Sequence, residues 1–156
     1  MLLDSCSSGF QEKSLSRLTR SDYGVKGLKL RQIATVVNGV ADTPKDWHKV
    51  KSRLIFEEQY VEGLCRLSES NWIWVIFGFH KRRGWQPKVR PRAAKDESTV
   101  GIFASRSVQR PNKIGLTLVE LVGVRGNIVT VKGLDAFDGS PVFDIKPFEK
   151  DYDLSK

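Results

Sequence analysis

The chain has few of the residues that build metal centres and disulfide frameworks. Its 156 residues include two cysteines, Cys6 and Cys65, and two histidines, His48 and His80. The cysteines lie far apart and form no CxxC pair, so we expect reduced thiols rather than a disulfide. Two histidines in distant segments do not complete a zinc site without several distant carboxylates. The sequence therefore predicts a protein without a metal.

Long apolar runs are also missing. No segment approaches the ~18 consecutive apolar residues that a membrane-spanning helix requires. The N-terminal residues lack the basic flank and the continuous apolar centre of a signal peptide. Neither a phosphate-binding P-loop nor a dinucleotide-binding GxGxxG fingerprint occurs. We therefore expect a soluble cytoplasmic protein, with no membrane partner, that uses neither of these nucleotide-binding motifs.

Positive charge and aromatic residues are plentiful instead. The 26 Lys and Arg residues exceed the 18 Asp and Glu residues, which gives a formal net charge of +8. Four Trp, eight Phe and a hydrophobic content of 40% indicate a globular core. Such an excess of positive charge favours an anionic partner, with nucleic acid or a membrane surface the usual candidates. Many small basic proteins have no such partner, so charge alone leaves this question open.

Short strands separated by turns dominate the chain after residue 27. Residues 1–27 are rich in Ser and lack periodicity, so we expect a poorly ordered or loosely docked extension. A single domain follows over 28–150, with a polar tail at 151–156, and one short helix is expected within 58–70. The pattern indicates a mainly β fold, an antiparallel barrel or sandwich with long loops. The strand-like segments are 28–37, 51–58, 71–80, 100–105, 114–124, 128–137 and 140–148.

The segment "NWIWVIFGFH" and the loop that follows it form the first candidate site. The segment reads as a strand buried on both faces, and it ends at His80, which suits either a structural role or a ligand contact. The following loop carries basic residues around Trp85, a combination that suits a phosphate backbone beside a stacked base. Its first three residues, Lys81, Arg82 and Arg83, are therefore candidates for substrate binding. A solvated basic loop is the alternative.

The segment "GIFASRSVQRPNKIGL" is the second candidate. It places Arg106 and Arg110 after a strand, and Pro111 fixes the backbone immediately afterwards. Asn112 tolerates a left-handed conformation and can hydrogen-bond its own backbone. Such a turn can hold two guanidinium groups ready for a carboxylate or a phosphate. An exposed hairpin with two surface arginines is the alternative reading.

The segment "GLDAFDGSPVFDIKP" is the third candidate. It brings Asp135, Asp138 and Asp144 close together in sequence, with Lys146 behind them. An acid in an Asp-Gly turn such as Asp138-Gly139 is usually conformational. Three acids could suggest Mg²⁺, but no phosphate-cradling glycine loop accompanies them.

The second and third segments together resemble the TsaA-like or TrmO family of tRNA methyltransferases. That family typically reads V-G-x-F-A-[ST]-R-S-x-x-R-P-N-x-I-G-[LM]-[ST], followed by L-D-x-x-D-G-[ST]-P-V-x-D-I-K-P. The strand ending in Phe79-His80 and the segment "KVRPR" also look like the family, and the similarity covers roughly residues 30 to 150. The resemblance implies a β-barrel that binds S-adenosylmethionine, unlike Rossmann-type methyltransferases. It also implies a homodimer and a tRNA substrate, methylated at the exocyclic nitrogen of N6-threonylcarbamoyladenosine beside the anticodon.

The resemblance also implies site residues. The implied cofactor contacts are Phe79, His80, Arg106, Leu116, Gly133, Leu134 and Asp135. Arg110, Asn112 and Lys146 occupy other motif positions and are assigned to the substrate, while Asp138 and Asp144 are candidates for the base that takes the proton. Many family members carry "F-G-x-P-R-Q" after the first strand, where this chain reads "GVADTPKDWHKV". Either Asp46 to His48 substitute for that segment, or the cofactor is held differently.

Three functions remain open at this level. The resemblance favours a methyltransferase, and a non-catalytic module of the same fold that binds the cofactor or RNA is the main alternative. A plain RNA-binding barrel accounts for the basic loop, but it does not account for the patterned segments around Arg106 and Asp135.

Overall fold

The structure is a computed structural model that describes residues 30–90 and 98–154. The chain divides into two units, Met1–Leu30 and Arg31–Lys156, and every element below belongs to the second. The predicted N-terminal extension and the thiol of Cys6 lie outside the described residues. Cys65 is a free, exposed thiol. Among the described residues, no helix is both long enough and apolar enough to cross a membrane.

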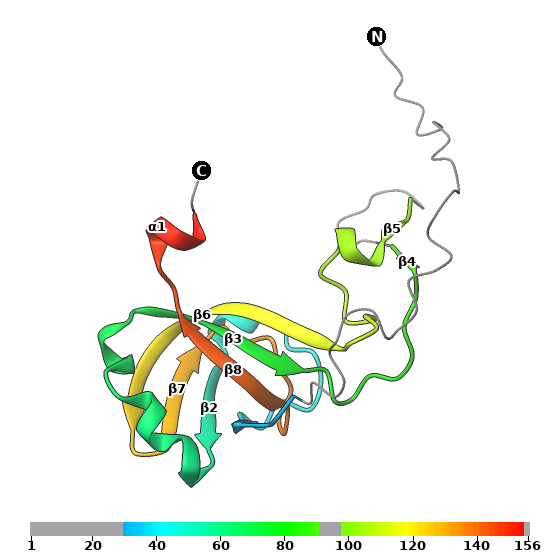
Figure 1. Cartoon of the computed structure of the whole chain (residues 1–156). Helices are drawn as coiled ribbons and strands as arrows, with labels where there is room; N and C mark the ends of the chain where they lie inside the picture. Colours follow the sequence, from blue (N-terminus) through cyan, green and yellow to red (C-terminus); the bar gives the residue numbers. More distant parts are fainter. Residues whose placement is uncertain (1–29, 91–97, 155–156) are drawn as a thin grey trace, which may run out of the picture. The chain divides into compact units, whose positions relative to one another are not determined.

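Six antiparallel strands close into a barrel in the order β1-β2-β7-β6-β3-β8 (Figure 1). This confirms the predicted fold class, and it decides between the barrel and the sandwich. The strands are β1 (Ala34–Val37), β2 (Lys51–Phe56), β3 (Trp72–Gly78), β6 (Ile114–Arg125), β7 (Ile128–Lys132) and β8 (Pro141–Pro147). A separate two-stranded sheet pairs β4 (Lys88–Val89) with β5 (Val100–Gly101).

Alternation of side chains along each strand builds the barrel interior. In β3, Ile73, Val75 and Phe77 are buried, and they meet the buried faces of the neighbouring strands. Trp72, which precedes them in the strand, is 47% exposed, and Trp74, between Ile73 and Val75, packs its ring against Phe148 on the outside. The strand prediction for this segment is confirmed. Its predicted burial on both faces is wrong, because the outer face of a single-layer barrel has no second layer to cover it.

Two other local predictions need correction. The segment 58–70 forms 3₁₀ helices, η2 (Glu58–Leu64) and η3 (Leu67–Glu69), separated by Arg66 at a left-handed φ of 63°. The predicted strand at 100–105 is a strand only over Val100–Gly101, and it turns into a 3₁₀ helix, η4 (Ile102–Ala104). Ile102 is buried in that turn, so its apolar character reflects packing rather than strand pairing. The polar tail begins with a short helix, α1 (Lys150–Asp153).

Three connections emerge at the same end of the barrel. The first, 38–50, joins β1 to β2 and contains η1 (Trp47–Lys49). The second, 79–113, joins β3 to β6, and the third, 133–140, joins β7 to β8. Gly78 pairs with Ile114, and the Phe79 amide donates to the Lys113 carbonyl oxygen at 2.9 Å, so the long second connection leaves and re-enters the barrel at one point. The three motif segments therefore meet at one rim of the barrel.

Candidate functional site

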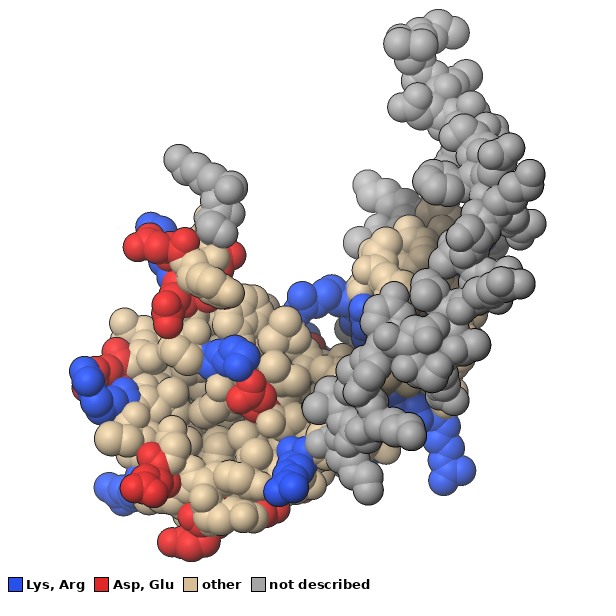
Figure 2. Space-filling model, in the orientation of Figure 1, with Lys and Arg blue, Asp and Glu red and all other residues tan. Residues whose placement is uncertain are grey.

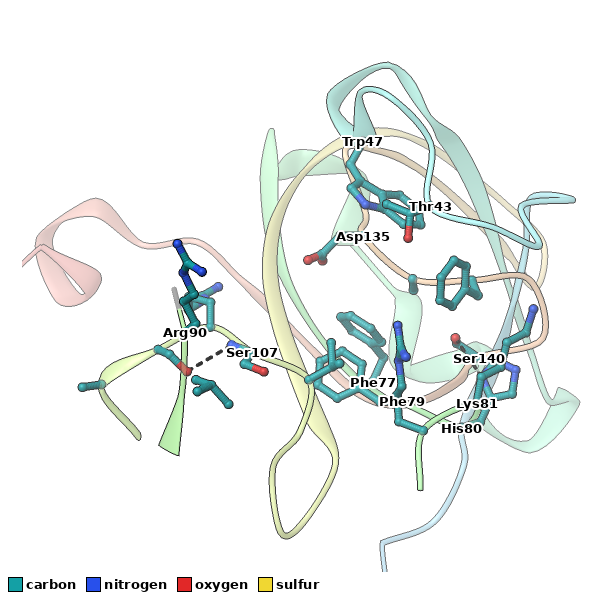
Figure 3. Close-up of a pocket in the computed structure, with 18 residues that line it drawn as sticks. Thr43, Trp47, Phe77, Phe79, His80, Lys81, Arg90, Ser107, Asp135 and Ser140 are labelled. Atoms are coloured by element: carbon teal, nitrogen blue, oxygen red, sulfur yellow. Dashed lines mark hydrogen bonds between the residues drawn. The ribbon is translucent and has the colours of Figure 1, made fainter. Parts of the chain in front are cut away.

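A hollow of about 570 Å³ lies at this rim. Its volume falls within the range of roughly 300–1,000 Å³ that is usual for small-molecule sites. Figure 3 shows Trp47 and Thr43 on one side of it, with Phe77 and Phe79 on the opposite side. Among the described residues, its lining comprises Thr43, Trp47, Phe77, Phe79, His80, Lys81, Arg82, Val89, Arg90, Ala104, Ser105, Arg106, Ser107, Val108, Asp135, Ala136, Phe137 and Ser140. The hollow thus combines aromatic walls with a few charged groups.

A second hollow of about 610 Å³ adjoins the first. Both are lined by Phe77, Phe79, Ser105, Arg106 and Asp135, so the two hollows share one wall. The second hollow adds Phe103, Arg110, Pro111, Asn112, Ile114, Gly115, Leu116 and Thr117. A ligand with two parts could therefore extend past Arg106 and Asp135 from one hollow into the other.

Arg106 and Asp135 are each fixed by one neighbour on β6. Arg106 Nη2 donates a hydrogen bond of 2.7 Å to the carbonyl oxygen of Leu116. The Thr117 hydroxyl donates to Asp135 Oδ1. Both charged groups are exposed at the rim, and each keeps further hydrogen-bonding atoms for a ligand. An anionic group can bind the guanidinium, and a hydroxyl or ammonium group can bind the carboxylate.

His80 lies two residues after the end of β3, where a serine from the third connection orients its ring. Its Nδ1 lies 3.1 Å from the hydroxyl oxygen of Ser140, which is buried. Figure 3 shows the two side chains together at the edge of the hollow. The ring is therefore positioned by one nitrogen and lines the hollow, which combines the structural and the ligand-binding readings of the sequence.

Arg110, assigned to the substrate from its motif position, contacts its own segment. Its Nη1 donates to the carbonyl oxygens of Ser105, at 2.8 Å, and of Ile102, at 3.3 Å. Its guanidinium carbon lies 5.8 Å from the centre of the Phe103 ring. The guanidinium therefore closes the turn around η4 and fixes the backbone carbonyl immediately before Arg106, while Arg110 also borders the second hollow.

The two candidate bases lie away from the hollows. Asp138 Oδ1 accepts hydrogen bonds from the amides of Gly39, at 2.9 Å, and Asn38, at 2.7 Å. These bonds, that of Gly39 foremost, lower the pKa of the Asp138 carboxyl below its ordinary value. Asp144 lies on β8, 2.7 Å from Lys146 Nζ, and this contact raises the pKa of Lys146. None of these three side chains lines either hollow.

The other predicted residues differ in what they present to the site. Leu134 is fully buried in the barrel core, so only its backbone can face a ligand. Gly133 adopts a φ of +94°, which favours glycine, and its amide donates to the Val50 carbonyl oxygen at 3.0 Å. Asn112 and Leu116 line the second hollow, and Lys81 and Arg82 line the first. Arg83 is exposed and lines neither.

Several lining residues were not among the site residues assigned from the sequence, although Trp47 lies within Asp46 to His48, the stretch expected as a possible substitute for the missing family segment. Thr43 and Trp47 come from the segment that departs from the family pattern. Phe137 lies beside Trp47, with ring centres 5.8 Å apart, and the Lys81 ammonium lies 4.9 Å from the centre of the Phe137 ring. The contacts that join these residues span three connections, so local sequence could not predict them.

The residues present suit a nucleoside-like ligand that carries charged ends. Aromatic rings from Trp47, Phe79 and Phe137 can contact a flat base, while Arg106 and Asp135 can bind an anion and a cation or hydroxyl. The described residues contain no group of three or more His, Cys, Asp or Glu that could hold a metal ion. The donor set therefore fits S-adenosylmethionine, which joins an adenosine to an amino-acid end.

The chain is similar to known proteins in both sequence and fold. The chain is 45% identical over 93 residues to a mouse protein named tRNA (adenine(37)-N6)-methyltransferase, covering 58% of this chain and 21% of the mouse protein. It is 41% identical over 99 residues to a probable S-adenosyl-L-methionine-binding protein of Methanothermobacter thermautotrophicus, covering 64% and 69% respectively. A crystal structure of TrmO superposes with a TM-score of 0.68 at 27% identity, over 84% of this chain and 61% of that one.

These matches cover more than half of this chain but a smaller share of its mammalian relatives. This chain spans 21–24% of the length of its mammalian relatives. Residues 32–154 match the family described as the tRNA-methyltransferase O N-terminal domain, which confirms the resemblance seen in the motifs around Arg106 and Asp135. The chain therefore belongs to the tRNA-methyltransferase O N-terminal domain family.

Proposed function

We propose that this chain is an S-adenosylmethionine-dependent methyltransferase that acts on the N6 nitrogen of the adenosine beside the tRNA anticodon, in its threonylcarbamoylated form. The observation that carries the proposal is the shared wall of the two hollows, where Arg106 and Asp135 lie between aromatic residues. Relatives named tRNA (adenine(37)-N6)-methyltransferase support the reaction, and a relative named as a probable S-adenosyl-L-methionine-binding protein supports the cofactor.

The site residues have separate tasks in this proposal. Arg106 binds the carboxylate of the cofactor, and Asp135 binds its ammonium group or a ribose hydroxyl. Phe79, His80 and Leu116 line the space around it, and the backbone of Gly133 and Leu134 shapes the rim. When bound, S-adenosylmethionine supplies a methyl group on a sulfonium whose positive charge is lost during transfer. Aromatic walls that exclude water suit the loss of that charge.

The acceptor nitrogen is a weak nucleophile, so positioning carries much of the catalysis. The Thr117 hydroxyl holds the Asp135 carboxylate, and Ser140 holds the His80 ring, so two polar groups at the rim have fixed orientations. The acceptor proton leaves to a base. We assign that role to neither Asp138 nor Asp144, since neither lines either hollow and Asp138 Oδ1 accepts two amide bonds.

The charge distribution supports an RNA partner at the same rim. The described residues of the connections at this end include four acids, Asp42, Asp46, Asp135 and Asp138, and ten basic residues: Lys45, Lys49, Lys81, Arg82, Arg83, Lys88, Arg90, Arg106, Arg110 and Lys113. At the opposite end and in α1, the described residues include four basic residues, Arg31, Arg66, Arg125 and Lys150, and seven acids: Glu57, Glu58, Glu62, Glu69, Glu149, Asp151 and Asp153. Figure 2 shows acidic side chains on the barrel away from the long connection and on α1. A polyanion is therefore attracted to the end that holds the site.

Two further parts of the proposal concern the assembly and the compartment. A homodimer is supported by Phe103 and Leu116, which border the second hollow and are 77% and 44% exposed. Sedimentation of the full chain tests it, with Phe103→Glu expected to shift a dimer to a monomer. We also propose that the protein is cytoplasmic. Asn112 borders the second hollow and is a proposed contact of the RNA. Arg110 bonds its own segment, and Lys146 lies at the end of β8 away from the rim, so neither is assigned to the RNA.

Nucleoside mass analysis tests the proposed reaction directly. Threonylcarbamoylated tRNA and the unmodified transcript are each incubated with the full chain and S-adenosylmethionine. We expect a product heavier by one methyl group on the threonylcarbamoylated nucleoside alone. Cofactor binding without any methylated nucleoside in either RNA would support the alternative, a non-catalytic binding module. Absence of cofactor binding would support a plain RNA-binding barrel.

A further inference from the structure

Trp47 gives the first hollow an aromatic wall from a segment that departs from the family pattern. The family motif P-R-Q is absent there, and the chain reads "DTPKDWHKV" over residues 42–50. Of Asp46, Trp47 and His48, only Trp47 lines the hollow. Asp46 Oδ1 accepts a hydrogen bond of 2.9 Å from the His48 amide and caps η1, and the His48 side chain is exposed. If one of these three residues substitutes for the missing motif at the hollow, it is Trp47, through its indole ring.

The indole is braced before a ligand arrives. Its ring meets Phe137 edge-on, with centres 5.8 Å apart and planes at 60°. The Lys81 ammonium lies 4.9 Å from the centre of the Phe137 ring and also donates to the Ala41 carbonyl oxygen at 3.1 Å, which ties the first connection to the second. The helix that carries Trp47 ends at Lys49, and the carbonyl oxygen of the next residue, Val50, accepts from the Gly133 amide. Phe137 thus contacts the indole directly, and contacts among the three connections hold the segments that carry both rings, which reduces the entropy lost on binding.

The face of a partly exposed indole suits one kind of ligand in particular. Figure 3 shows Trp47 across the hollow from Phe77 and Phe79, with Asp135 beside the space between them. Flat heterocyclic bases stack on aromatic side chains, and hydrogen-bonding groups at the rim then fix their edges. Thr43, next to Trp47 in the lining, provides a hydroxyl at that position.

We propose that Trp47 is the stacking platform for an adenine ring in the first hollow. This inference rests on the proposed function, in which both ligands contain adenine: the cofactor and the acceptor nucleoside. The chemistry recognised is the same in both cases, and the experiment below distinguishes the two sources. Asp135 and Arg106 then contact the polar groups attached to that adenosine, since they line the same hollow.

Intrinsic tryptophan fluorescence of the full chain tests the stacking without any measurement of activity. A base stacked on an indole quenches its emission, whereas methionine, which has no base, does not. The first arm adds S-adenosylhomocysteine. The second arm adds a synthetic anticodon stem-loop RNA to protein saturated with S-adenosylhomocysteine. Quenching in the first arm assigns the cofactor adenine to Trp47, and quenching only in the second assigns the acceptor base.

Variants connect the quenching to this residue. Trp47→Phe removes the indole but keeps an aromatic ring, so we expect the quenching to disappear while binding weakens about 2-fold. Trp47→Ala removes the platform, and we expect binding of the quenching ligand to weaken about 10-fold by calorimetry. Trp72→Phe is the matched control, because Trp72 is 47% exposed at the start of β3, away from the site, and lines neither hollow. That variant keeps the Trp47 signal and the affinity.

Two results would overturn the inference and leave the proposed function intact. One is tight binding of S-adenosylhomocysteine to the wild-type chain with no quenching in either arm. The other is unchanged calorimetric affinity of Trp47→Ala for both ligands, with circular dichroism showing that the variant is folded. By contrast, failure of the wild-type chain to bind S-adenosylhomocysteine at all would refute the proposed function and this inference together.

Discussion

Arg110 Nη1 donates a hydrogen bond of 2.8 Å to the carbonyl oxygen of Ser105, the residue immediately before Arg106. The two arginines of the turn therefore differ in what they hold. Arg110 satisfies backbone carbonyls of its own segment, whereas Arg106 stands exposed on the wall shared by both hollows. The guanidinium of Arg110 closes the turn, and the guanidinium of Arg106 is available to a ligand.

Replacement of either arginine separates these tasks. Arg110→Ala removes two hydrogen bonds to carbonyl oxygens, so we expect a loss of about 1–2 kcal/mol in the free energy of unfolding. Arg106→Ala removes an exposed side chain, so its stability stays within about 0.5 kcal/mol of the wild type. We expect that variant to lose binding of S-adenosylmethionine instead. Urea denaturation and calorimetry measure the two effects, and a stable Arg110→Ala variant with intact binding would contradict this division.

Thr117 orients Asp135, and a pair of substitutions isolates its hydroxyl. Thr117→Val keeps the shape of the side chain but removes the donor, so the carboxylate loses its fixed position. We expect cofactor binding to weaken by roughly 5- to 10-fold, which corresponds to about one hydrogen bond. Thr117→Ser keeps the hydroxyl and serves as the control, with affinity close to that of the wild type. Equal affinities of the Val and Ser variants would show that this contact does not position Asp135.

Gly115 gives Phe77 the space that it occupies under the two hollows. A Cβ at Gly115 would lie 2.5–2.9 Å from three atoms of the Phe77 ring, which is buried and cannot move freely. We expect Gly115→Ala to lower the free energy of unfolding by about 1–3 kcal/mol and to weaken cofactor binding, because Phe77 lines both hollows. Gly123→Ala, in the same strand, has no heavy atom within 4 Å of the added Cβ. That control is expected to denature like the wild type.

Asp138 links the first and third connections through a carboxylate whose pKa is lowered by the amides of Gly39 and Asn38. A lowered pKa in the folded state means that ionised Asp138 stabilises the fold. This contribution is fully present above the ordinary value of 3.8, and it is lost as the pH falls through the lower folded-state pKa. We expect Asp138→Asn to be less stable than the wild type at pH 7 and pH 5, with a smaller difference near pH 3.

Denaturant titrations at these three pH values measure the Asp138 effect. Asp42→Asn, which changes an exposed carboxylate in the same connection as Asn38 and Gly39, is the control and should show little difference at any pH. A wild-type advantage over Asp138→Asn that does not change with pH would mean that the charge of Asp138 plays no part in holding the two connections together.

Arg82 and Arg83 stand at the start of the long connection, beside the site. If this loop contacts the RNA backbone, Arg82→Ala/Arg83→Ala weakens tRNA binding and reduces the dependence of log K on log salt concentration by about 1–2. Arg125→Ala/Lys150→Ala removes the same charge elsewhere, at the end of β6 away from the long connection and in α1. We expect that control to keep the wild-type slope. Filter binding at several salt concentrations measures both variants.

The sequence by itself determined the strands and the family motifs. Runs of aromatic and β-branched residues between turn signals predicted β3, β6, β7 and β8, and alternation of apolar residues predicted β2. Turn residues at Arg125 to Asn127 predicted the hairpin between β6 and β7. These signals are local, so they can be read without knowledge of what packs against them.

Only the tertiary structure decided which of the motif residues share a site. The apolar run at Ile102 looked like a strand, but it forms a buried 3₁₀ turn that Arg110 closes. Asp138 and Asp144 carry the acids expected near the chemistry, yet they lie outside both hollows. Trp47 joins the site because barrel closure brings the connections 38–50, 79–113 and 133–140 to one rim. That meeting depends on contacts between residues far apart in sequence, which no local pattern encodes.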